Sequence, residues 1–166
     1  MINSFGKLDA SETISFLATR NKVERFLISI PDPNNNEKYI DIYLSPQCST
    51  NIKIDTSSSS PYIKLKFKFT GRIYSMSNDY NYLSTDVLNS ISSSCNKQLE
   101  SMFSDFLYKT SKDLKSDICG LGKYSLSNFL TTSEFENYNW LDNYKNAFFD
   151  VEVDTSIKSG MLITET

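Results

Sequence analysis

Ile63-Lys64-Leu65-Lys66-Phe67-Lys68-Phe69 is the stretch that decides the fold, because its apolar and basic residues alternate strictly. Such alternation is typical of a β-strand with one face in a core and the other in water. A second strand is predicted over residues 148–158; its acidic face carries Asp150, Glu152 and Asp154, and its other face carries Phe149, Val151, Val153, Thr155 and Ile157. Because the opposite charges recur at the same period, we expect strands 62–70 and 148–158 to be neighbours.

The longest helix is predicted over residues 85–118, with Ser84 or Thr85 as its N-cap. Its apolar residues follow steps of three and four and form one stripe suited to lie on a sheet, namely Leu88, Ile91, Cys95, Leu99, Met102, Phe103, Phe106, Thr110 and Leu114. Gly120 and Gly122 are predicted to end or kink this helix. Shorter helical segments are expected over residues 125–130 and 134–144.

The part of the chain before this helix predicts mainly strands. Asp9 and Glu12 form a capping box for a helix that ends near Asn21. Strands are expected over 23–30, 38–45 and 51–55, with a turn over 31–36, a break or bulge at Pro46 and a bend or bulge at Gly71. This order of elements predicts one α+β domain over residues 1–166, in which one long helix and shorter helices pack on a mostly antiparallel β-sheet.

The composition excludes several classes of function. The chain has 166 residues, no histidine and a net charge of −3. The absence of histidine removes Ser-His-Asp and Cys-His nucleophile pairs and histidine-based zinc sites. No cluster of Lys and Arg is dense enough to indicate a nucleic acid or an anionic membrane surface as a partner. No apolar run reaches the roughly 18 residues that a membrane-spanning helix requires.

The cysteines give no metal or redox motif. Cys48, Cys95 and Cys119 contain no C-x-x-C spacing, and an odd number cannot pair fully within one chain. Cys95 lies on the apolar side of the predicted helix and is interpreted as a buried thiol. A Cys48–Cys119 or Cys95–Cys119 bridge remains an alternative that depends on geometry.

The remaining candidate residues favour structural roles. Gly120-Leu121-Gly122 follows a helix, whereas a dinucleotide-binding loop follows a strand, so helix termination is favoured. Asp117 is interpreted as a cap or an acceptor of backbone N–H groups from the glycines. The acidic residues of strand 148–158 are too far apart for one calcium ion and form a solvated face. Trp140 is interpreted as a core plug together with Phe135, Tyr138 and Phe148. No catalytic, cofactor-binding or metal site is predicted.

The end of the chain resembles the C-terminal domain of the spore germination receptor C-subunit family, the Ger(x)C lipoproteins. The family runs from a long helix into Asp-Ile-x-Gly-Phe-Gly, then through a basic segment with Pro and Trp to a second Trp, and later into Phe-x-Asp-Val-x-Val-x-Val and a terminal Arg-x-Gly. This chain matches those motifs at Asp117, Ile118, Gly120, Gly122, Trp140, Phe149, Asp150, Val151, Val153 and Gly160. Residues 6–13 also resemble the family's Val-Gly-x-Leu-x-x-x-Glu-Thr. The chain departs at Leu121, where the family has Phe, at Lys158-Ser159, and in the missing Pro–Trp pair, near whose place Phe135 stands.

The resemblance implies a non-enzymatic subunit domain of a nutrient germinant receptor, which contributes to spore germination through protein contacts. It implies membrane-embedded A and B subunits as partners, and lipid anchoring of the full-length protein on the outer face of the inner spore membrane. The signal peptide, lipobox and upstream domains of the family are not expected in this chain, which resembles an excised terminal domain that is soluble by itself.

Two other functions stay open from the residues alone. A small-ligand-binding module would need a pocket between the long helix and the sheet, lined by Tyr39, Tyr43 and Phe103. A carboxylate-based hydrolase would need two acidic groups that face each other across a cleft.

Overall fold

The computed structural model describes residues 7–33, 35–76 and 84–158. It confirms an α+β fold. The elements are α1 (Ala10–Thr19), β1 (Phe26–Asp32), β2 (Asn35–Pro46), β3 (Asn51–Asp55), β4 (Tyr62–Met76), α2 (Thr85–Lys112), α3 (Gly122–Ser125), a 3-10 helix (Leu126–Asn128), α4 (Thr132–Tyr138), α5 (Trp140–Tyr144) and β5 (Phe148–Lys158).

The five strands form one sheet around β4. β2 and β3 both pair antiparallel with β4, β1 pairs antiparallel with β2, and β5 pairs parallel with β4. The predicted neighbourhood of strands 62–70 and 148–158 is therefore confirmed, and the sheet is mostly antiparallel with one parallel pair. The parallel pair follows from the connection, since α2 and the short helices provide the long crossover that parallel strands require.

Residues 47–50 interrupt what would otherwise be one long strand along β4. Pro46 lies opposite Phe69, and β3 begins with Asn51 opposite Lys66. Between them the chain bulges outward, held by a 2.8 Å bond from the Gln47 N–H to the carbonyl of Lys68. The break predicted at Pro46 and the resumption at residue 51 are both confirmed.

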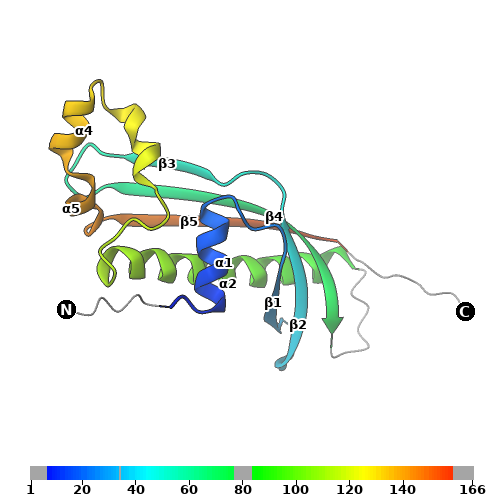
Figure 1. The fold of residues 1–166 in the computed structure, drawn as a ribbon. Coiled ribbons are helices and arrows are strands. Elements are labelled where there is room, and N and C mark those ends of the chain that lie inside the picture. Colours follow the sequence, from blue (N-terminus) through cyan, green and yellow to red (C-terminus); the bar gives the residue numbers. More distant parts are fainter. Residues whose placement is uncertain (1–6, 34, 77–83, 159–166) are drawn as a thin grey trace, which may run out of the picture.

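One face of the sheet is covered and the other is open. In Figure 1, α2 runs along the covered face, and α1 crosses beside it. Phe103 of α2 packs against Phe67 of β4 with the rings tilted and their centroids 4.6 Å apart. The same core also holds Ile30, Ile40, Ile42, Leu44, Ile63, Leu65, Ile91 and Leu99. Complete burial of such side chains contributes about 1.5–3 kcal/mol each. The open face carries the polar residues of the alternating strands.

The capping predictions are confirmed at the front of the chain. The Asp9 carboxylate accepts from the Glu12 N–H at 2.8 Å, and the Glu12 carboxylate accepts from the Asp9 N–H at 3.0 Å. Asn21 has a φ of 57°, which lets the chain leave the helix. Ser84, rather than Thr85, caps α2 and accepts from the Val87 N–H.

Several predicted details are wrong. The turn expected over 31–36 is shorter, because β1 runs to Asp32 and β2 begins at Asn35. The long helix ends at Lys112, before Gly120 and Gly122, because Lys115 adopts a φ of 48° and the N–H groups of Leu114 and Ser116 close the helix end. Leu114 is consequently 38% exposed. The helix expected over 134–144 is two helices, α4 and α5, separated by the left-handed Asn139. The bulge considered at Gly71 lies instead between Ile73 and Ser75, opposite Asp41 and Ile42, while Gly71 itself stays in register with Leu44; the alternative of a bend at Gly71 stays a prediction.

Candidate functional site

Asp117 organises the turn that follows α2. Its two carboxylate oxygens accept the N–H of Leu121 at 2.8 Å, the N–H of Gly122 at 2.7 Å and the indole Nε1–H of Trp140 at 3.0 Å. The predicted acceptance of backbone N–H groups is confirmed. The bond to Trp140 joins the turn to α5, a link between residues 23 positions apart that no local pattern in the sequence indicates.

The two glycines of this turn serve different needs. Gly120 has a φ of 72°, a left-handed conformation that other residues adopt only with strain. Gly122 lies directly under the indole, where an added Cβ would stand 2.7 Å from Trp140 Nε1. Both roles are structural, which agrees with the interpretation of this loop as a turn rather than a phosphate site.

Trp140 fills the core as predicted, but with other neighbours. It is 7% exposed and packs against Tyr144 at a centroid distance of 5.7 Å. Phe135 and Tyr138 instead surround Phe129, at 5.5 and 5.3 Å. Phe148 is 58% exposed on the open face of the sheet and takes no part in the plug.

The predicted acidic face of β5 is paired with lysines of β4. Lys64 contacts both Asp150, at 2.9 Å, and Glu152, and Lys66 contacts Glu152 at 2.6 Å. Lys64 lowers the pKa of both carboxyl groups and holds them ionised. Tyr62 donates a further hydrogen bond to Asp150 at 2.7 Å. These carboxylates therefore stabilise strand pairing and are poorly suited to act as general acids.

The three cysteines are free thiols, so neither bridge considered above is present. Burial raises the pKa of Cys95 to about 11 and that of Cys119 to about 12. A thiol with such a pKa is a poor nucleophile near neutral pH because the thiolate is scarce. Cys48 is exposed on the bulge between β2 and β3.

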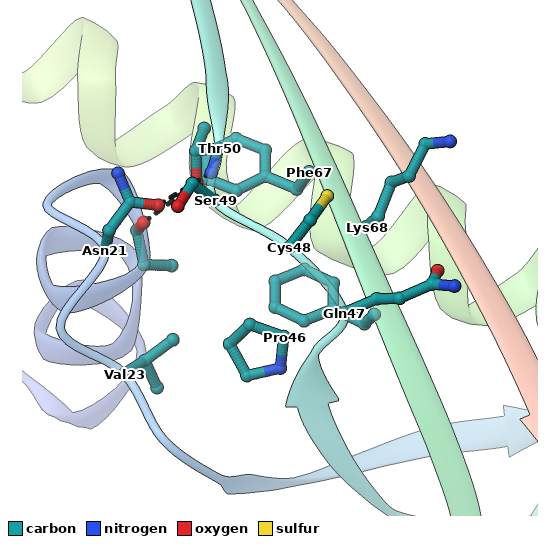
Figure 2. A pocket seen from close by; sticks show the side chains of 11 residues that line it. Asn21, Val23, Pro46, Gln47, Cys48, Ser49, Thr50, Phe67 and Lys68 are labelled. Atoms are coloured by element: carbon teal, nitrogen blue, oxygen red, sulfur yellow. Dashed lines mark hydrogen bonds between the residues drawn. The ribbon is translucent and has the colours of Figure 1, made fainter.

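No common pocket is formed by Tyr39, Tyr43 and Phe103. Phe103 is fully buried in the helix–sheet interface, whereas Tyr39 and Tyr43 are exposed on the opposite face of the sheet. A pocket of about 140 Å³ lies elsewhere, between the end of α1 and the bulge (Figure 2). There the Thr50 N–H donates to Asn21 at 2.6 Å, and Cys48 stands on the rim. This volume is well below the roughly 300–1,000 Å³ of ordinary ligand pockets.

Acidic residues also line a hollow of about 460 Å³ between α1 and α2. Two of them, Asp9 and Glu12, already serve in helix capping and ion pairing. The carboxylate of Asp9 caps α1, and the Glu12 N–H that it accepts lowers its pKa. Glu12 pairs with Lys109 of α2. Among the described residues, no group of three or more His, Cys, Asp and Glu side chains could hold a metal ion.

A second feature of the open face, at the end of the sheet away from the lysine–carboxylate pairs, is not indicated by the sequence. Leu27, Tyr43 and Tyr74 are exposed there, and the rings of the two tyrosines meet edge to face at 4.9 Å. Arg72 of β4 lies beside them, directly opposite Lys158 of β5. Only the register of the strands brings these residues together, so the linear pattern could not have revealed the group.

Residues 3–161 match the family described as "Spore germination B3/GerAC like, C-terminal". The chain belongs to this family. A solved structure, "Crystal Structure of the GerBC protein", has the same fold with a TM-score of 0.74 at 16% sequence identity, over 92% of this chain and 47% of that one. The chain thus spans about half the length of the solved protein. No curated protein matches the sequence significantly.

Membership of the GerAC-like family agrees with the resemblance drawn from the sequence motifs and supports a germination-related role. In this structure, motif residues Asp117, Gly120, Gly122 and Trp140 build the turn after α2. Phe149 and Val151 lie on the helix side of β5, and Ile118 packs against the core. Gly160 lies outside the described residues. None of the helices in the described part of the chain is long and apolar enough to cross a membrane.

Proposed function

We propose that this domain is a non-catalytic part of a nutrient germinant receptor and acts through protein contacts at the inner spore membrane. Its partners in this proposal are the membrane-embedded A and B subunits, and a lipid anchor upstream of this chain holds the full-length protein on the outer face of that membrane. The match of residues 3–161 to the GerAC-like C-terminal family carries the proposal.

The chemistry of the side chains supports a contact function over catalysis. The carboxylates nearest to one another on the sheet are paired with Lys64 and Lys66, and the buried thiols have raised pKa values. The pocket beside the bulge is small for a nutrient-binding cavity, and the larger hollow between α1 and α2 is lined mainly by polar and charged side chains, whereas ordinary ligand pockets are mostly apolar. An open sheet face, in contrast, offers a broad rigid surface of the kind that protein partners use.

Deletion of the domain in spores tests this proposal. Spores that lack residues 7–158 should lose the response to the nutrients sensed by this receptor and should still germinate with a nutrient-independent trigger. Immunoblots for the A and B subunits should show whether the receptor still assembles. A normal nutrient response in the deletion strain would overturn the proposal.

A further inference from the structure

The cations on the open face of the sheet differ in their surroundings, and Lys53 and Lys68 form no ion pair with any described residue. Lys64 and Lys66 are neutralised by Asp150 and Glu152, as described above. Two rows beyond Lys68, Arg72 and Lys158 lie directly opposite each other on β4 and β5. Both side chains are exposed, and neither forms an ion pair with any residue in the described part of the chain.

This placement carries a local cost. Like charges directly across two strands destabilise a sheet, where an opposite pair would contribute roughly 0.2–1 kcal/mol. The same two strands carry opposite charges at Lys64 and Asp150, and Asp150 and Glu152 offset the charge of Lys64 although Lys53 also lies opposite it. No described carboxylate offsets Arg72 or Lys158 in this way. Departures of this kind from local consistency are expected where a surface serves a function.

Aromatic and apolar side chains of β1 and β2 continue the cross-strand row that contains Arg72 and Lys158. Tyr43 pairs with Arg72 across β2 and β4, and Leu27 pairs with Tyr43 across β1 and β2. Tyr74 stands beside Tyr43 and is 66% exposed. Tyrosine and arginine are the residues most enriched, with tryptophan, among those that dominate binding energy at protein interfaces.

We infer that this patch, defined by Leu27, Tyr43, Arg72, Tyr74 and Lys158, docks a partner protein that presents carboxylates beside apolar side chains. The uncompensated charge of Arg72 and Lys158 selects an acidic partner, and a guanidinium can hold a carboxylate through two parallel hydrogen bonds. The tyrosines and Leu27 supply the apolar contact. The inference rests on the proposed function, because the receptor's A and B subunits are the proteins it assigns to this surface.

A protein partner fits the patch better than an anionic membrane does. A membrane surface is wide and would also face the acidic residues of β5 on the same side of the sheet, among them the exposed Asp154. A protein can place its carboxylates over Arg72 and Lys158 alone. The local charge is therefore complementary to a small acidic surface, while the whole chain has a net charge of −3.

Photo-crosslinking in spores tests this inference with the full-length protein. Benzoylphenylalanine is placed at Tyr74 or, as a matched control, at Phe148, an exposed aromatic residue at the opposite end of the same face. Immunoblots then probe for the A and B subunits. We expect a cross-link to one of the two subunits from position 74 and none from position 148.

Charge reversal supplies the second arm. Arg72→Glu with Lys158→Glu should lower the yield of the position-74 cross-link by about tenfold, since loss of complementary charge weakens encounter and binding. Lys53→Glu, an exposed lysine of β3 on the same face, should leave it unchanged. Immunoblots of the variant protein check that it accumulates to the normal level, which a protein that fails to fold would not be expected to do.

The possible failures are distinguishable. If domain deletion abolishes the nutrient response while the double reversal leaves the cross-link intact, the inferred surface is wrong and the proposed function stands. If deletion leaves the nutrient response normal, the proposed function is wrong. If the double reversal leaves the cross-link intact but abolishes binding of the protein to vesicles of phosphatidylglycerol and phosphatidylcholine, the patch contacts lipid and the inference is overturned.

Discussion

Gly71→Ala should destabilise the domain through one identifiable contact between β4 and β5. An added Cβ at position 71 would overlap Cδ1 of Ile157 and would lie 3.0 Å from Leu44 Cδ2 and 3.1 Å from Ile42 Cγ2. All three neighbours are buried and come from both flanking strands. Overpacking of this kind costs about 1–3 kcal/mol.

Because the added Cβ overlaps Ile157, the destabilisation by Gly71→Ala should depend on the side chain at position 157. Ile157→Val removes the Cδ1 atom itself and alone should cost about 0.5–1.5 kcal/mol. In the double variant the added methyl group occupies the space that this deletion leaves. We therefore expect the double variant to be more stable than the sum of the single effects predicts, by about 1 kcal/mol or more, which is the range of coupling between residues in contact.

Urea unfolding of the wild type, Gly71→Ala, Ile157→Val and the double variant measures this coupling. Gly120→Ala is the matched control, because no atom lies within 4 Å of its added Cβ and its cost arises from a φ of 72°. Its effect should add to that of Ile157→Val within about 0.5 kcal/mol. Additive effects for Gly71→Ala and Ile157→Val would refute the parallel register of β4 and β5.

Three further outcomes are expected. Asp117→Ala should cost about 3 kcal/mol in urea unfolding: hydrogen bonds to a charged acceptor contribute about 1.5–3 kcal/mol each and three donors lose theirs, but water reaches this half-buried turn and replaces part of the loss. The exposed Asp113→Ala should have little effect, and equal losses would contradict the role of Asp117. A thiol reagent at neutral pH should modify Cys48 in the folded protein and all three cysteines after unfolding; rapid modification of a second thiol before unfolding would contradict the burial described. Lys64 lowers the pKa of the carboxyl groups of Asp150 and Glu152 on β5. Their contribution to stability is therefore present above the unfolded pKa and is lost as pH falls through the folded pKa, so Lys64→Gln should reduce the slope of stability against pH below about pH 4.5. An unchanged slope would show that these ion pairs are not formed.

The strands and their faces were predictable because period-two alternation reports directly which side chains are buried. The neighbourhood of β4 and β5 was also predictable, because their charges match in sign and period. The parallel direction of that pair was not, since alternation and charge are the same in either direction. The juxtaposition of Arg72 and Lys158 was not predictable either, because it depends on the parallel register that places them opposite each other.

The end of α2 and the partners of Asp117 show a different limit. The polar residues after Lys112 continue the periodic pattern of the helix, and Lys115 is not a residue that favours its observed left-handed conformation. Gly120 and Gly122, which were predicted to end or kink the helix, belong to the next turn, which is built around Asp117. Its acceptor role was predictable from neighbouring residues, whereas its bond to Trp140 depends on how α5 folds back, which is a tertiary effect.

Side chains that bond to backbone groups at the β3 and β5 edges of the sheet indicate how a partner can contact this domain. At β3 the Asn128 side chain donates to the carbonyl of Ile54 at 2.8 Å. At β5 the Val153 N–H donates to Glu100 of α2 at 3.0 Å, and the Phe149 N–H lies 3.4 Å from the hydroxyl of Tyr108. Side chains that occupy edge groups oppose the addition of a further strand. Contact through the open face requires no such displacement, and this favours a partner that docks on the face of the sheet over one that adds a strand at β3 or β5.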